Sequence, residues 1–299
     1  MSAAQRLGAG GRHHAVDLRV VDSLTMESAL PGRIEQPAAE IGFWSSLVDV
    51  LARFARGTTL SDSERHRLHL IGFAASRFGA PLLSAGSLDE LDDRVDTLIS
   101  DPEILQLGDF GIRSMPETDL HRLAAEAAPP PPLVELLGRG TLPHLEEGFR
   151  LMAAAAEALA SLLPDLRAVP PRPADPGEPT DPLAFLSDPA IPAEVGACLL
   201  GAFRAVVCLL AIAQVVITRQ RPEPWLARAI VERWTGGMRA QLRLLASLPG
   251  LSIPESFIPA EERLDIAKLS RQAQEADRRM REMMEAAKAS GENIYREAG

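Results

Sequence analysis

Residues 195–218 read VGACLLGAFRAVVCLLAIAQVVIT, the longest apolar run in the chain. At 1.5 Å per residue, a helix of this length spans about 36 Å, enough to cross the roughly 30 Å hydrocarbon core of a bilayer. A helix that is apolar on all sides is also typical of the central element of a large helical core. This stretch therefore decides the fold, because it lies either inside protein or inside lipid.

The residues around this stretch favour the core. Four arginines follow it and three acidic residues precede it, namely Arg219, Arg221, Arg228 and Arg233 after it and Asp181, Asp188 and Glu194 before it. The positive-inside tendency would keep the C-terminal side in the cytoplasm and export the N-terminal two-thirds. Residues 1–20 contain no apolar segment that could start export. We therefore expect a core helix, with membrane insertion of residues 195–218 as the alternative.

Small residues form one stripe along this predicted helix. Ala197, Gly201, Ala205 and Cys208 follow one another at spacings of four, four and three. Such a stripe lets a second helix approach closely, in water or in lipid. Arg204 borders it, and we expect its long stem to carry the charge to the surface. The alternative is an anion-binding or catalytic arginine.

Composition restricts the classes of function. The 299 residues carry a net charge of −10, with residues 1–218 at −12 and residues 219–299 at +2. This acidity argues against a nucleic-acid binder, which needs a concentrated basic surface. Lysine occurs only at positions 268 and 288, a bias towards arginine that indicates a high-GC bacterial gene. Cys198 and Cys208 are too far apart on one helix for a disulfide, which fits a reducing cytoplasm.

The pattern of the whole chain predicts a mostly α fold: a multi-helix, bundle-like array with Pro-rich connectors and a long C-terminal amphipathic helix. We divide it into five segments. Residues 1–37 are a flexible N-terminal segment with one short strand at 16–21, and residues 38–163 are an N-terminal helical region. Residues 164–193 are a Pro-rich linker or long loop. Residues 194–260 hold the central apolar helix and the helices after it, and residues 261–299 hold a C-terminal heptad helix and tail.

Four capping-box spacings mark predicted helix starts. In each, a serine is followed three residues later by glutamate, at Ser61/Glu64, Ser87/Glu90, Ser100/Glu103 and Ser114/Glu117. Gly57 is placed to end an earlier helix. Pro129–Pro132 is expected to break the chain, a further helix should run from His144 to about Leu163, and Gly236-Gly237 should bend or split the helix that begins after Pro222.

Two motifs could carry chemistry. His66 and His69 are spaced to share one face of a helix, as a metal pair would be, but no further ligand pattern accompanies them. Asp92, Asp93 and Asp96 have the DDxxD spacing used for magnesium-diphosphate binding. The apolar stripe of that segment, Leu88, Leu91, Val95 and Leu98, leaves the aspartates on the opposite face, so we interpret them as a solvated acidic surface. We therefore assign no metal, cofactor or catalytic residue.

The C-terminal segment carries a heptad seam. Its members are spaced alternately three and four apart: Ile266, Leu269, Ala273, Ala276, Met280, Met283 and Ala287. We expect a protein partner or a second copy to bind through Ile266, Leu269, Ala273, Ala276, Met280 and Met283, because a heptad seam is the signature of helix pairing. The alternative is one more helix packed on its own domain.

Three functions follow as hypotheses. The first is a cytoplasmic, all-helical interaction or regulatory protein whose C-terminal helix binds a partner or a second copy. The second is a membrane-associated protein that inserts residues 195–218. The third is an all-α enzyme without a local signature, for which the first candidates are His66, His69, His121, His144 and Arg204.

Overall fold

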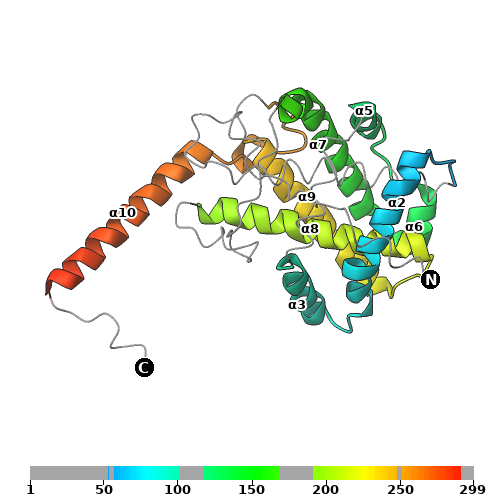
Figure 1. Ribbon diagram of the computed structural model, residues 1–299, viewed down its shortest axis with the longest axis horizontal. Coiled ribbons are helices and arrows are strands. Elements are labelled where there is room, and N and C mark those ends of the chain that lie inside the picture. Colours follow the sequence, from blue (N-terminus) through cyan, green and yellow to red (C-terminus); the bar gives the residue numbers. More distant parts are fainter. Residues whose placement is uncertain (1–52, 54–56, 102–116, 169–190, 248–250, 291–299) are drawn as a thin grey trace, which may run out of the picture.

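The computed structural model describes residues 53, 57–101, 117–168, 191–247 and 251–290, and it confirms a mostly α fold (Figure 1). Those residues form eight α-helices and no strand: α2 (Asp62–Ala74), α3 (Leu88–Ile99), α5 (Glu117–Ala125), α6 (Pro131–Leu137), α7 (Leu142–Ala168), α8 (Ala193–Thr218), α9 (Pro224–Leu245) and α10 (Ile266–Ser290). The predicted strand at 16–21 lies outside the described residues, and so does most of the helix that was predicted to end at Gly57.

Helix α8 lies at the centre of the core. Sixteen of its 26 residues are buried, and helices α2, α3, α6 and α9 all contact it. It is long and apolar enough to cross a membrane, and 72% of its most apolar 18-residue window is covered by protein. Burial on all sides explains why the apolar residues of α8 follow no single stripe.

Helices α8 and α9 approach each other through small residues. A β-carbon on Gly237 would lie 2.3 Å from both the Gly201 carbonyl oxygen and the Ala205 β-carbon, and one on Gly201 would lie 2.9 Å from the Ala240 β-carbon. The predicted small-residue stripe is therefore a helix-packing surface, although Ala197 at its start is exposed. The sequence predicted that Gly236-Gly237 bends α9 or splits it in two. A split is wrong, because α9 is one continuous helix. Gly237 allows α8 to approach closely and does not interrupt α9.

Two further glycines allow close crossings. The π-helical turn η2 (Ala75–Gly79) continues α2 into the 3₁₀ turn η3 (Ala80–Ser84), and a β-carbon on Gly79 would lie 2.3 Å from the carbonyl oxygen of Leu210. On α7, a β-carbon on Gly148 would lie 2.4 Å from the ring of Trp234, which is 1% exposed. Gly79 thus lies against the backbone of α8, and Gly148 of α7 lies against a side chain of α9. Contacts this close indicate a densely packed core.

Two of the four predicted capping serines, Ser61 and Ser87, cap the helices that follow them. At Ser61 the box is complete, since the Ser61 hydroxyl accepts from the Glu64 N–H and Glu64 accepts from the Ser61 N–H at 2.7 Å. Ser87 caps α3, but Glu90 accepts from the Gly86 N–H instead. The other two boxes fall partly outside the described residues. Gly57 has φ of 73°, and the Thr58 N–H donates to the Arg53 carbonyl, as at a helix end.

Two predicted boundaries are wrong. Pro129–Pro132 is not a break throughout, because Pro131 and Pro132 form the first turn of α6, where a missing N–H costs no helical hydrogen bond. Helix α7 also continues through Pro164 to Ala168, beyond its predicted end at Leu163. Residues 169–190 of the predicted Pro-rich linker lie outside the described residues, and α8 begins at its last residue, Ala193.

Candidate functional site: the C-terminal helix and its anchor

Helix α10 begins at a capped turn. Asp265 is its N-cap, because the Asp265 carboxylate accepts from the Lys268 N–H at 2.8 Å and the Asp265 carbonyl accepts from the Leu269 N–H at 2.9 Å. From there to Ser290 the sequence contains no glycine or proline and is rich in Ala, Arg, Glu, Met and Gln, which are strong helix formers. The local sequence thus favours a helix even where nothing packs on it.

The first turn and a half of α10, which we call the root (residues 266–270), belongs to the core. Ile266 is 8% exposed, Ser270 is 1% exposed, and Leu269 packs against the same core cluster. These residues fix where α10 leaves the rest of the protein. Ile266 and Leu269, two of the six residues predicted to bind a partner, therefore pack within the chain.

Beyond the root, α10 projects away from the other helices; we call residues 271–290 the arm (Figure 1). None of the other described helices packs along the arm. Its seam carries large apolar side chains in solvent: Met280 is 59% exposed, Met283 is 69% exposed, and the adjacent Met284 is 43% exposed. Ala276 is also exposed, and Ala273 is half-buried. An apolar row of this kind on an isolated helix is typical of an interaction surface.

Ion pairs within the helix itself stabilise the polar side of the arm. Three arginine–carboxylate pairs one turn apart link Arg279 to Glu275, Arg281 to Asp277 and Arg278 to Glu282. Exposed pairs of this spacing contribute only about 0.3–0.5 kcal/mol each, so they support the helix without making it stable alone.

The segment that joins α9 to α10 is anchored to the core. Ile253 and Ile258 are buried, and the 3₁₀ turn η7 (Ala260–Glu262) precedes the Asp265 cap. The Arg243 guanidinium of α9 donates to the Glu262 carbonyl at 3.0 Å, and the Leu264 N–H donates to the Ser247 hydroxyl at 2.9 Å. The direction of the arm is therefore set by contacts with the end of α9.

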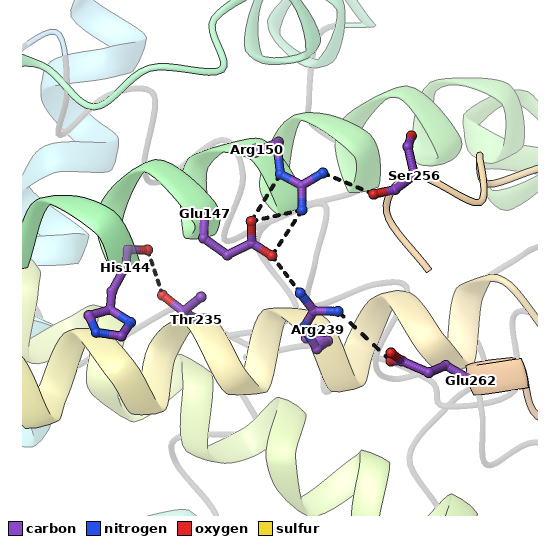
Figure 2. Close-up of polar contacts among 7 residues, drawn as sticks. All are labelled: His144, Glu147, Arg150, Thr235, Arg239, Ser256 and Glu262. Carbon is purple, nitrogen blue, oxygen red and sulfur yellow. Dashed lines mark hydrogen bonds and ion pairs between the residues drawn. The ribbon is translucent and has the colours of Figure 1, made fainter. Parts of the chain in front are cut away.

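A carboxylate–arginine network strengthens this anchor (Figure 2). Glu147 of α7 accepts from Arg150 one turn later, with the closest contact at 2.7 Å, and from Arg239 of α9 at 2.6 Å. Arg150 also donates to the Ser256 carbonyl at 3.1 Å, and Arg239 lies 3.8 Å from Glu262. One carboxylate, Glu147, thus connects two helices to the segment that leads to α10.

A neighbouring pair of contacts ties α7 to α9 about one helical turn earlier in both helices. The Thr235 hydroxyl donates to the His144 carbonyl at 2.9 Å, as Figure 2 shows, and the His144 ring Nε2 lies 3.0 Å from Glu232. Glu232 also accepts from Arg228 at 2.7 Å. His144, a candidate catalytic residue in the sequence, is therefore placed in a helix–helix contact.

Two of the three aspartates of the DDxxD motif bind arginines of other helices. Arg233 of α9 makes a two-pronged contact with Asp92 at 2.6 and 2.7 Å, and Arg204 of α8 contacts Asp96 at 2.8 Å. The Arg233 hydrogen bond lowers the pKa of Asp92 below its ordinary 3.8. A magnesium-diphosphate site would need these carboxylates turned into an apolar cavity, whereas here they hold α3 against α8 and α9.

These contacts refine two predictions. The aspartates are exposed, as expected, but the sequence did not indicate that two of them are paired; the buried stripe of α3 is Leu91, Val95 and Ile99, while Leu88 is 52% exposed. Arg204 does reach the surface, where Asp96 matches its charge.

The remaining candidate residues do not form a reactive group. His66 and His69 are both exposed on α2, and His121 is exposed on α5. Within the described ranges, no group of three His, Cys, Asp or Glu side chains is placed to hold a metal ion. An open depression of about 240 Å³ lies beside α3, lined by Pro81, Glu90, Asp93, Arg94, Thr97 and Leu98. Arg94 is engaged there with the Ser84 hydroxyl at 2.6 Å and with Glu90.

No family model, curated protein or solved structure matches this chain. Function is therefore inferred from the residues of the chain itself.

Proposed function

We propose that this chain is an all-helical interaction protein whose arm binds another helix, from a second copy or from a partner protein. The observation that carries the proposal is the exposure of Met280, Met283 and Met284 along the arm, which projects away from the other described helices (Figure 1). Unbranched methionine side chains adapt to the surface they meet and are common at protein-binding faces.

The binding surface we propose is the part of the heptad seam beyond the root. It consists of Ala273, Ala276, Met280, Met283 and Ala287, with Met284 beside it. Alanine at three seam positions lets a second helix approach closely, and the methionines supply the apolar area. The core contacts of the root hold this surface clear of the remaining helices.

Magnitudes indicate a weak and reversible association. Full burial of a methionine is worth about 1.5–3 kcal/mol, so two seam methionines on each of two helices contribute roughly 6–12 kcal/mol. The loss of translational and rotational freedom costs about 4–15 kcal/mol. The free energy gained by burial exceeds the cost of association by about 8 kcal/mol at most, which corresponds to dissociation constants in the micromolar range or weaker. Such an affinity is expected for a regulatory contact rather than a permanent complex.

The charge of the chain supports a protein partner over nucleic acid. The net charge is −10, and the arm alternates acidic and basic side chains that pair within the helix. No concentrated basic surface is left on this face to bind phosphates. A bacterial, cytoplasmic setting belongs to the same proposal and follows from the arginine bias and the two unlinked cysteines.

Site-specific photo-cross-linking in cells that express the full chain tests this function. A photoreactive amino acid at Met283 on the seam should give a discrete adduct, identified by mass spectrometry. The same amino acid at Glu285, which lies on the outer face of the same turn, is the matched control and should give none. Equal adducts from both faces, or no discrete adduct from position 283, would overturn the proposal.

A further inference from the structure

We propose that the helix bound by the arm is the arm of a second copy, aligned antiparallel; this rests on the association proposed above. The structural basis is a helix whose root packs in the core and whose arm exposes Met280 and Met283, so the surface offered for pairing lies in the distal part of α10. An antiparallel pair centred between Met280 and Met283 overlaps residues 273–290 of each arm and does not disturb the root.

In this alignment the seam is complementary to itself. Met280 of one copy lies opposite Met283 of the other, and Ala276 lies opposite Ala287, so large side chains meet large ones at the centre and small ones meet at the ends. The helices can therefore approach closely at both ends while the methionines fill the middle. A self-complementary surface is what a two-fold symmetric dimer requires.

The flanking charges select this register. With Met280 opposite Met283, Arg279 faces Ala286 of the second copy and Asp277 faces Met284, so no like charges meet. A slide of one heptad towards the root places Arg279 opposite Arg279 and Asp277 opposite Asp277, which is repulsive in both cases. If one helix slides by one heptad away from the root, only residues 280–290 of the two described helices overlap.

The charge of the rest of the protein selects the antiparallel direction. The described residues that precede residue 266 hold 17 basic and 23 acidic side chains, a net charge of −6. In a parallel dimer the roots of the two copies would lie side by side, with the axes of the two α10 helices only about 8–10 Å apart. The two acidic bodies, which are the described residues before α10 in each copy, would then lie close together. Antiparallel arms place the bodies at opposite ends of the pair, farther apart than the Debye length of about 8–10 Å.

Distances between spin labels on the full chain test this arrangement. Arg271→Cys and Glu285→Cys place labels at equivalent outer-face positions two heptads apart, both exposed. The native Cys198 and Cys208 are buried, so labelling is directed to the introduced cysteine. In the antiparallel dimer, the two labels at 271 are offset along the axis by about 30 Å and the two labels at 285 by about 10 Å.

We expect the label distance at position 271 to exceed that at position 285 by more than about 10 Å. Equal distances at the two positions would show a parallel dimer and overturn the inference. No dipolar coupling at either position, up to a chain concentration of several hundred micromolar, would also overturn it. If photo-cross-linking from position 283 still yielded a face-specific adduct with a different protein, the proposed function would stand with a heterologous partner.

Discussion

Gly237 of α9 lies so close to Gly201 of α8 that a β-carbon on Gly237 would be 2.3 Å from the Gly201 carbonyl oxygen. The same β-carbon would be 2.3 Å from the Ala205 β-carbon. Both neighbours are parts of a helix that cannot yield as a flexible side chain would. The contact between the two most buried helices of the core therefore depends on glycine at this position.

The first prediction concerns this contact. Gly237→Ala should force α8 and α9 apart and lower the free energy of unfolding by about 1–3 kcal/mol, as overpacking of a core does. Its control is Gly236→Ala, one residue away, because Gly236 is exposed and a β-carbon there meets nothing within 4 Å. That change should stabilise the protein by about 0.5–1 kcal/mol, since alanine favours a helix. Urea unfolding of both variants measures the difference; equal effects would disprove the close-contact account.

The sequence predicted this helix pair in part. The small-residue stripe indicated close approach, and Gly201 and Ala205 do make it, because spacing along one helix is a local property. The partner could not be predicted, since nothing in the order of residues says that α9 rather than another helix lies on the stripe. For the same reason the sequence does not show that Gly79 lies against the backbone at Leu210, 131 positions later in the chain.

The second prediction concerns the Asp92–Arg233 pair. The folded-state pKa of Asp92 is below its ordinary value of 3.8, so its stabilisation is complete above that value and is lost as pH falls through the folded pKa. Asp92→Asn should reduce stability by about 0.5–1 kcal/mol at pH 7, because the pair is half-exposed. The loss should be smaller near pH 2 than at pH 7, because protonation of Asp92 removes the charge on which the ion pair depends. Asp93→Asn, on the same turn, is the control, and the same loss at both pH values would contradict the ion pair.

The third prediction concerns alkaline pH. Burial raises the pKa of Cys208 from 9.0 to about 12. The unfolded thiol ionises first, so stability is complete below pH 9 and falls as pH rises towards 12, by about 1.4 kcal/mol per unit for one thiol. Two lysines and one tyrosine leave few other groups to titrate there. Denaturant titrations at pH 8–11 should show a shallower slope for Cys208→Ala than for the native chain; identical slopes would refute the assignment.

The fourth prediction concerns the anchor of α10. Glu147→Gln removes the charge that Arg150 and Arg239 share and should lower the free energy of unfolding by about 1–2 kcal/mol. It should also raise hydrogen exchange at the amides of residues 251–265, because Arg150 positions the Ser256 carbonyl. Glu146→Gln, at an exposed position next in the chain, is the control. Unchanged exchange in the Glu147 variant would mean that the network does not hold this segment.

The candidate site also divides into a predictable and an unpredictable part. The seam of α10 was readable because a heptad pattern needs only one helix. The anchor was not, because Glu147 and Arg239 are 92 residues apart and Arg150 and Ser256 are 106 apart. Nor could the pattern show that Ile266 and Leu269 pack within the chain, since a seam residue is equally apolar whether it meets its own core or another molecule.

The most direct test of the central claim is the sedimentation-equilibrium mass of the full chain, without detergent, up to several hundred micromolar. We predict a mass that rises with concentration from 32.2 kDa towards twice that value. Met283→Glu should hold the mass at that of one chain. Gln274→Glu, which adds the same charge at an exposed position off the seam, should leave the rise unchanged. A mass of one chain at every concentration, or a dimer that persists in Met283→Glu, would contradict self-association through the arm.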